Sequence, residues 1–203
     1  MKIICIGRNY AKHVEELQNE TPSDPVIFIK PDSAILLHQH PFVIPEFSQE
    51  IQHEIEIIVK INKVGKHIDT KFAHKYYDEI SVGIDFTARD VQNELKSKGL
   101  PWEKAKSFDG SAVIGEFISK KQFNSLENLS FELKNNAKTV QKGNTSAMMW
   151  NIDQLISYIS QYFTLKIGDI IFTGTPEGVA VVKTDDVLEG YLESNKLFSI
   201  KIK

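Results

Sequence analysis

The chain has 203 residues, which is enough for one substantial core and short for two, so we expect a single domain over residues 1–203. Its net charge of −3 provides no basic field for nucleic acid or an anionic membrane, and no apolar run is long enough to span a bilayer. One cysteine excludes an intrachain disulfide, and the first apolar run is too short for a signal peptide, so we expect a cytoplasmic protein.

The first part of the chain predicts a short buried strand over residues 2–6, a break at residues 7–9 and a helix over residues 10–17. On that helix His13 and Glu16 are three residues apart, so their side chains can touch. A glutamate that accepts from one ring nitrogen fixes the histidine tautomer and makes the other nitrogen more basic. This pair is therefore a candidate base with its orienting carboxylate, or else an ordinary solvated pair.

Strands follow over residues 26–29, 34–37 and 42–44, and a longer alternating stretch covers residues 51–61. Lys30 ends the first of these strands and is unremarkable unless it faces a site. In the alternating stretch the isoleucines and valine at odd positions share one face of a strand. Glu54 and Glu56 point together to the other face, about 7 Å apart. A solvated polar face is the ordinary interpretation of two such glutamates.

A second apolar run, residues 81–86, follows a short helix expected over residues 70–77 with Asp69 or Thr70 as its cap. This run delivers another carboxylate, Asp85. Two glutamates from one strand and an aspartate from another make an all-oxygen ligand set. Such a set suits a hard divalent cation, Mg²⁺ or Mn²⁺, and leaves positions open for water and substrate.

Three further motifs have both a functional and an ordinary interpretation. Arg89 and Gln92 are neighbours on a helix expected from residue 87 to about residue 98, where they either form a fork toward a substrate or face water. Lys106 lies in an expected polar loop, residues 104–110, where it could hold a carboxylate or simply be exposed. The tight loop around Thr175 could present N–H groups and a hydroxyl to an anion, although by itself it is a turn.

The second half of the chain predicts mostly short strands. Residues 129–134 and 137–141 form a hairpin, because the asparagines at 135 and 136 tolerate positive φ. An amphipathic helix covers residues 152–163, with Asn151 as its N-cap. Strands follow near residues 170–173, 179–182, 186–193 and 197–202. Many short strands with few helices favour a β-rich α+β fold over a doubly wound sheet.

Taken together, these motifs resemble the fumarylacetoacetate hydrolase family. The blocks that carry the resemblance are, in chain order, Gly7-Arg8-Asn9-Tyr10 with His13 and Glu16, Phe28-Ile29-Lys30-Pro31, His53-Glu54-Ile55-Glu56, residues 85–92, residues 98–102 with 105–108, and residues 168–176. The resemblance runs from Gly7 to the C-terminus. It is nearest to the short, single-domain members that act on acylpyruvates and oxaloacetate, without the N-terminal domain of the longer members.

The resemblance implies a mixed β-roll with few short helices and a homodimer. It implies Mg²⁺ or Mn²⁺ on Glu54, Glu56 and Asp85. It also implies a catalytic pair on a mobile lid helix and further residues around the substrate. The residues in these roles are His13, Glu16 and Lys106 as catalytic residues and Arg89, Gln92 and Thr175 as substrate-binding residues.

The resemblance further implies a small 2-oxo acid or 1,3-diketo acid as substrate. We first expect metal-dependent hydrolysis of the C–C bond of an acylpyruvate, in which His13 backed by Glu16 activates water and Lys106 stabilises negative charge. Oxaloacetate decarboxylation, with or without keto–enol tautomerisation, is the alternative, and hydroxymuconate-type isomerisation would use the same site. A non-catalytic dicarboxylate binder is less favoured because it has no need of the His13–Glu16 pair.

Overall fold

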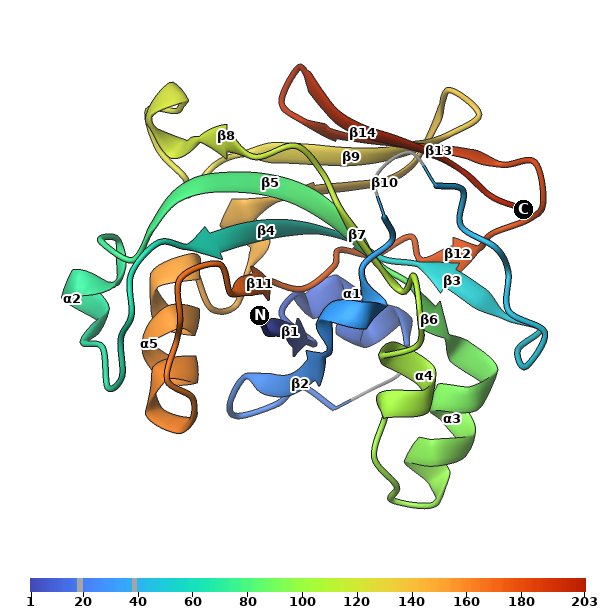
Figure 1. Cartoon of the computed structure of the whole chain (residues 1–203), viewed down its shortest axis with the longest axis horizontal. Coiled ribbons are helices and arrows are strands. Elements are labelled where there is room, and N and C mark those ends of the chain that lie inside the picture. The colour runs from blue at the N-terminus through green and yellow to red at the C-terminus, as the bar shows by residue number, and fades with distance from the viewer. Residues whose placement is uncertain (18–19, 38–39) are drawn as a thin grey trace.

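The computed structural model describes residues 1–17, 20–37 and 40–203 (Figure 1). The fold is rich in strands, and its helices are short, which confirms the predicted β-rich α+β class. The helices are α1 (Ala11–Glu16), α2 (Thr70–Ala73), α3 (Arg89–Ser97), α4 (Glu103–Lys106) and α5 (Ile152–Tyr162). No helix in the described ranges is long and apolar enough to cross a membrane.

The largest sheet has the strand order β2-β1-β11-β4-β5-β7. The short strand β8 also pairs with β5, at a different part of that strand from β7. Its strands are β1 (Ile3–Gly7), β2 (Val26–Lys30), β4 (Ile55–Ile61), β5 (Tyr77–Asp85), β7 (Ala112–Ile114), β8 (Ile118–Ser119) and β11 (Ile170–Phe172). β1 and β11 run parallel and the other pairs run antiparallel, so the sheet is mixed.

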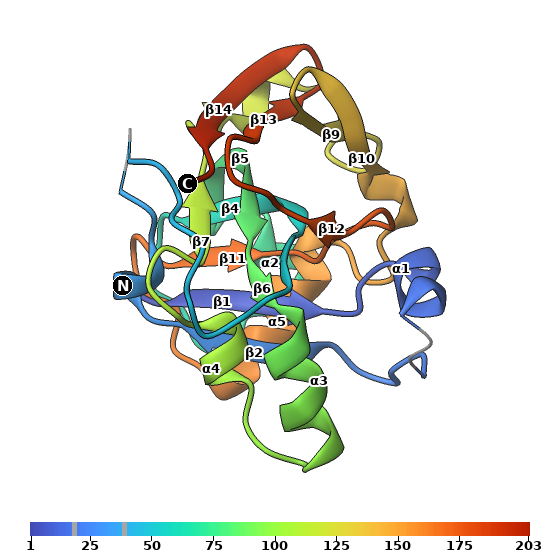
Figure 2. The same ribbon diagram turned by 90° about the vertical axis from the view of Figure 1, so that its right-hand side faces the viewer.

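Two smaller sheets complete the fold. One has the order β10-β9-β13-β14 and lies over one side of the largest sheet (Figures 1 and 2). The other has the order β12-β3-β6 and continues from the ends of β4 and β5. Their strands are β3 (Ile51–His53), β6 (Thr87–Ala88), β9 (Ser130–Asn135), β10 (Lys138–Asn144), β12 (Ala180–Val181), β13 (Val187–Leu192) and β14 (Asn195–Lys201).

Both faces of β4 are buried. The odd-numbered Ile55 and Ile57 pack in the larger core cluster together with Leu155 of α5. On the opposite face Ile58 packs in a second cluster with Phe172 of β11. The predicted alternation is therefore correct, but the even-numbered face is enclosed by protein rather than solvated.

The chain leaves regular strand geometry at the point where the two glutamates lie. Glu54 separates β3 from β4, and Phe86 separates β5 from β6. The two breaks lie side by side, because Asp85 N donates a hydrogen bond to Glu54 O at 2.9 Å. The junction between the largest and the three-stranded sheet thus brings the carboxylates of two strands together.

The 129–141 hairpin is confirmed as β9 and β10. Its two turn residues with positive φ are Asn136 (49°) and Ala137 (65°), one position later than predicted. Other boundaries differ more. Residues 34–37 and 42–44 form no strands but isolated bridges, Ile35 with Ala112 and Phe42 with Ile202, partners far away in sequence that local patterns cannot reveal.

Two helical predictions also need correction. The helix predicted to start at residue 70 ends at Ala73, because the chain must enter β5 at Tyr77. The polar loop predicted from residue 104 instead contains α4, and Lys106 is the last residue of that helix. This short helix fixes the direction in which the Lys106 side chain leaves the backbone.

The cap of α5 gives a test of the fold. Asn151 Oδ1 accepts from Gln154 N at 3.0 Å, and Gln154 Oε1 accepts from Asn151 N at 2.9 Å, which is a capping box. Asn151→Ala should lower the free energy of unfolding by about 1 kcal/mol, because the Gln154 N–H loses its acceptor. Asn151→Asp, which keeps the acceptor, is the control. Urea unfolding measures both, and equal stability of the two variants would contradict the assignment.

Candidate active site

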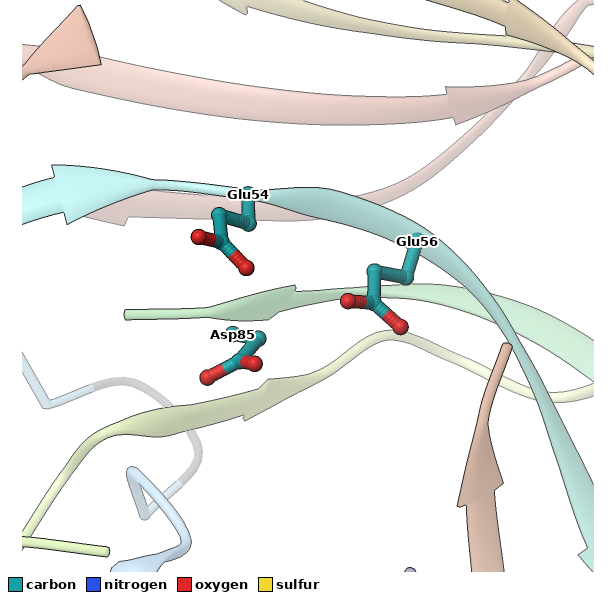
Figure 3. A group of neighbouring side chains, drawn as sticks. All are labelled: Glu54, Glu56 and Asp85. Atoms are coloured by element: carbon teal, nitrogen blue, oxygen red, sulfur yellow. The ribbon is translucent and has the colours of Figure 1, made fainter. Parts of the chain in front are cut away.

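Three buried carboxylates meet at the junction between the largest and the three-stranded sheet. Figure 3 shows the side chains of Glu54, Glu56 and Asp85 directed into one space between the strands. Each offers an oxygen atom, and these atoms lie within 4.8 Å of one another. All three residues are at most 5% exposed. Charges this close in the interior of a protein require compensation.

Three buried cations provide part of that compensation. Lys106 Nζ donates to Glu54 Oε2 at 2.8 Å and to Asp85 Oδ2 at 2.7 Å. Lys30 Nζ lies 2.8 Å from Asp85 Oδ1, and Arg89 Nη2 donates to Glu54 Oε1. Three formal negative charges thus face three formal positive charges inside the protein.

The compensation is uneven among the carboxylates. Burial by itself would raise the pKa of Glu54, but Lys106 and Arg89 outweigh it and hold this pKa well below its usual range. Burial would lower the pKa of Lys106, but Asp85 and Glu54 reverse the effect and raise this pKa. The pKa of Glu56 is raised, first by burial and then by the charges of Asp85 and Glu54.

Glu56 is therefore the carboxylate whose charge lacks a partner. Within the described ranges no lysine, arginine or histidine forms an ion pair with it, and its Oε2 accepts an N–H from Gly174 at 2.6 Å. Asp85 Oδ1 receives no hydrogen bond of good geometry, despite its contact with Lys30. Buried carboxylate oxygens with unused lone pairs are the ligands of hard divalent cations. The residues fit Mg²⁺ or Mn²⁺.

His13 and Glu16 form a pair on α1. His13 Nδ1 lies 3.1 Å from Glu16 Oε2, and Glu16 Oε1 accepts from Gly178 N at 2.9 Å. Because an ionised carboxylate only accepts, we assign the ring proton to Nδ1 and the lone pair to Nε2. His13 is buried and lines the same cavity as the three carboxylates, so it is not part of a solvated surface pair.

Arg89 and Gln92 lie in the first turn of α3 and touch each other. Arg89 Nη1 donates to Gln92 Oε1 at 2.6 Å, and Arg89 Nε donates to Gln52 Oε1 at 2.8 Å. Together with the bond to Glu54, these contacts use three of the five N–H donors of the guanidinium. Arg89 thus holds a candidate metal ligand in this arrangement.

The turn at Thr175 is hydrogen-bonded to the first residue of β4. The Thr175 hydroxyl donates to Ile55 O at 2.8 Å, one residue before Glu56. The sequence predicted that this turn presents N–H groups to an anion, and the anion that Gly174 N meets is the Glu56 side chain of the protein itself. The turn therefore supports the carboxylate group from the side of β11.

One cavity of about 40 Å³ collects eight of the nine predicted site residues, and Glu16 lies just outside it. Its wall also includes the aromatic residues Phe28 and Trp102, the basic residues Arg8 and Lys96, and Ile6, Gly7 and Leu17. A larger surface groove of about 530 Å³ lies elsewhere, beside Tyr77, Met148 and Ile152. In the described part of the chain, the carboxylate group at the small cavity is the one set of residues arranged to hold a metal, so chemistry rather than size identifies the site.

Two further buried polar residues at this site were not among the predicted site residues. The sequence left Lys30 as an ordinary strand end unless it faces a site, and it is fully buried and contacts Asp85. Gln141 is 2% exposed and bonds to Ile55 N and Thr175 Oγ1. No local pattern could have placed Gln141 there, because it arrives from the four-stranded sheet.

Comparison with known sequences finds close relatives over the whole chain. The chain is 41% identical over 201 residues to a Bos taurus protein named oxaloacetate tautomerase FAHD1, mitochondrial, covering 99% of this chain and 90% of the relative. It is 38% identical to a protein of Escherichia coli strain K12 named oxaloacetate tautomerase YcgM, covering 97% and 90%.

Solved structures share the fold. A fumarylacetoacetate hydrolase family protein from Yersinia pestis superposes with a TM-score of 0.95 at 37% identity, covering 100% of this chain and 93% of that chain. A fumarylpyruvate hydrolase from Pseudomonas aeruginosa, in complex with Mn²⁺ and pyruvate, gives a TM-score of 0.93 at 30% identity, covering 100% and 89%. Residues 2–201 match the family described as fumarylacetoacetate (FAA) hydrolase, C-terminal. The chain belongs to the fumarylacetoacetate hydrolase family.

Proposed function

We propose that this protein is a divalent-metal-dependent enzyme that interconverts the keto and enol forms of oxaloacetate or a similar small 2-oxo acid. The observation that carries the proposal is that the buried His13 side chain, paired with Glu16, lines the same cavity as the carboxylates Glu54, Glu56 and Asp85. Two relatives, 41% and 38% identical, are named oxaloacetate tautomerases, and the Pseudomonas structure holds Mn²⁺ with pyruvate, a 2-oxo acid.

The proton transfer would use His13. Its Nε2 removes the proton from C3 of the keto form, and the electron pair of the C–H bond moves to form the enolate. The imidazolium then delivers the proton to the oxygen at C2, which gives the enol and restores neutral His13. Glu16 stabilises the imidazolium through Nδ1–H and keeps the ring oriented during both transfers.

The enolate needs positive charge around it. A divalent cation held by Glu54, Glu56 and Asp85 would supply Lewis acidity toward the 2-keto oxygen. Lys106 points its ammonium at Glu54, Asp85 and Thr87 Oγ1, the last at 2.6 Å. In this arrangement the ammonium of Lys106 already makes three hydrogen bonds, so Lys106 would stabilise the enolate by its positive charge and not by a further hydrogen bond. The side chains of Phe28 and Trp102 line the cavity beside these charged groups.

Hydrolysis of an acylpyruvate, the first expectation from the sequence, is the second candidate. The same His13–Glu16 pair could activate a water for attack on the distal carbonyl. The fumarylpyruvate hydrolase of Pseudomonas aeruginosa, 30% identical, supports it. Oxaloacetate decarboxylation needs no attacking water and would use the same electron sink. The homodimer stays a prediction from the resemblance, and the cytoplasmic location stays a prediction from the composition of the sequence.

The metal can be tested through protein stability. In Glu56→Gln an amide replaces the uncompensated charge and still accepts from Gly174 N, so the metal-free variant should match or exceed wild type in Tm at pH 8. The rise in Tm that Mn²⁺ gives wild type should be lost. Glu79→Gln, which changes an exposed carboxylate on β5, is the control and should keep that rise. An equal Mn²⁺ effect in Glu56→Gln and wild type would refute the ligand assignment.

The base can be tested by substitution on α1. His13→Ala should lower kcat/KM for oxaloacetate tautomerisation by about 10²–10⁴-fold, the usual contribution of a general base, while Mn²⁺ binding persists. Glu16→Gln should lose less, because the imidazole stays in place. Glu15→Gln removes the exposed neighbouring carboxylate and serves as the matched control. Unchanged activity in His13→Ala would leave the pair without a role in proton transfer.

The two candidate reactions differ in their products. Tautomerisation consumes no water and releases no pyruvate, so the Mn²⁺-loaded protein should accelerate the decay of the enol absorbance of oxaloacetate. It should release pyruvate from acetylpyruvate much more slowly. A lactate dehydrogenase-coupled assay measures the second rate. If kcat/KM for acetylpyruvate cleavage equals or exceeds that for tautomerisation, hydrolysis is the function.

A further inference from the structure

Gln141 enters the site from a different sheet. It lies on β10, where the pairing with β9 shifts register between Thr139 and Gln141. Such a bulge re-aims the side chains that follow it. The Gln141 side chain is buried and reaches the junction of β3 and β4, where it meets the backbone between the two candidate glutamate ligands.

Both ends of the Gln141 amide are bonded. Its Oε1 accepts from Ile55 N at 3.1 Å and lies 2.8 Å from His53 Nδ1. Its Nε2 donates to Thr175 Oγ1 at 3.0 Å and to Pro176 O at 3.1 Å. The amide cannot be flipped, because a backbone N–H only donates and a backbone carbonyl only accepts. The same logic assigns a proton to His53 Nδ1.

These bonds hold both peptide units that flank Ile55. Gln141 holds the Ile55 N–H directly, and it holds the Ile55 carbonyl through the Thr175 hydroxyl. Ile55 is the residue between Glu54 and Glu56, so its orientation sets the directions in which both carboxylates leave the backbone. β5 pairs with Ile55 on one side, but on the other side β11 reaches only Ile58 and β12 pairs only with β3, so no strand in the described ranges holds Ile55 there.

The same bonds also decide what Thr175 can offer to a ligand. Its hydroxyl proton goes to Ile55 O, and one of its two lone pairs is taken by Gln141 Nε2. One lone pair remains, and Thr175 lines the cavity. Thr175 therefore meets a ligand as an acceptor, suited to an enol hydroxyl or a water, and not as a donor to a carboxylate.

We propose that Gln141 is a positioning residue that orients the two glutamate ligands through Ile55 and holds Thr175 as a hydrogen-bond acceptor in the cavity. The inference rests on the proposed function in one respect, that the carboxylates bind a divalent cation. Groups that orient metal ligands commonly contribute 10–100-fold to metal affinity or activity.

Gln141→Met tests the proposal, since it keeps length and apolar volume but removes every hydrogen bond. The Mn²⁺ dissociation constant, measured by titration with EPR detection of free Mn²⁺, should rise about 10–100-fold. Gln141→Glu keeps the oxygen toward Ile55 N and loses the donors. Its Mn²⁺ dissociation constant should rise less than that of Gln141→Met, and, as in Gln141→Met, its KM for oxaloacetate should be higher than that of wild type, because Thr175 is no longer held as an acceptor.

Thr145→Val is the matched control. Thr145 follows β10 directly, is 5% exposed, and its Oγ1 accepts from Leu129 N at 2.9 Å, but it lines the surface groove beside Tyr77 instead of the small cavity. It should lose stability without losing Mn²⁺ affinity. Wild-type affinity in Gln141→Met, or an equal loss in Thr145→Val, would overturn the proposal. If Gln141→Met does not fold, Gln141→Glu decides, and an unchanged KM refutes the positioning of Thr175.

Amide hydrogen exchange of the metal-free protein separates this proposal from the proposed function. Gln141→Met should speed exchange over residues 53–57 and 174–176 and leave α5 unchanged. If wild type takes up no Mn²⁺, the metal-dependent function fails, but faster exchange in these two segments still supports Gln141 as the group that holds them. Unchanged exchange refutes its role whatever the metal result.

Discussion

The site depends on one electrostatic constraint: three carboxylates with oxygens within 4.8 Å of one another are buried together. Such a group folds only when positive charge is built around it, because each unpaired charge in the interior costs several kcal/mol. Lys106, Lys30 and Arg89 provide this charge from a helix end, a strand end and a helix start. Much of the fold near the junction of the sheets can be understood as the scaffold that delivers these side chains.

The sequence predicted the features that depend on local pattern. The odd–even alternation of β4, the Asn151 cap and the turn of the β9–β10 hairpin follow from periodicity and from residues that tolerate special backbone geometry. The nine candidate site residues lie together or next to one another, although their roles stay predictions. Their recognition depended on the order of the family motifs, since each motif alone had an ordinary interpretation.

What could not be predicted depends on long-range partners. The strand predicted over residues 42–44 is instead a single bridge from Phe42 to Ile202. A partner so far away in the chain leaves no trace in the local sequence pattern. The burial of Glu54 and Glu56 is imposed by sheets and helices distant in sequence, while the alternating pattern alone suggested a solvated face. Gln141 is the clearest example, because nothing in the sequence around it indicates that its side chain is bonded to the backbone of Ile55.

The balance of charge inside the site also bears on how the protein matures. Because its own lysines and arginine offset Glu54 and Asp85, we expect the chain to complete its core at a ribosome or in a cell starved of metal. A zinc finger, in contrast, stays unfolded until its ion arrives. For this protein the ion would be acquired by a finished molecule, so metal supply would set the fraction of molecules that are active rather than the fraction that survive degradation.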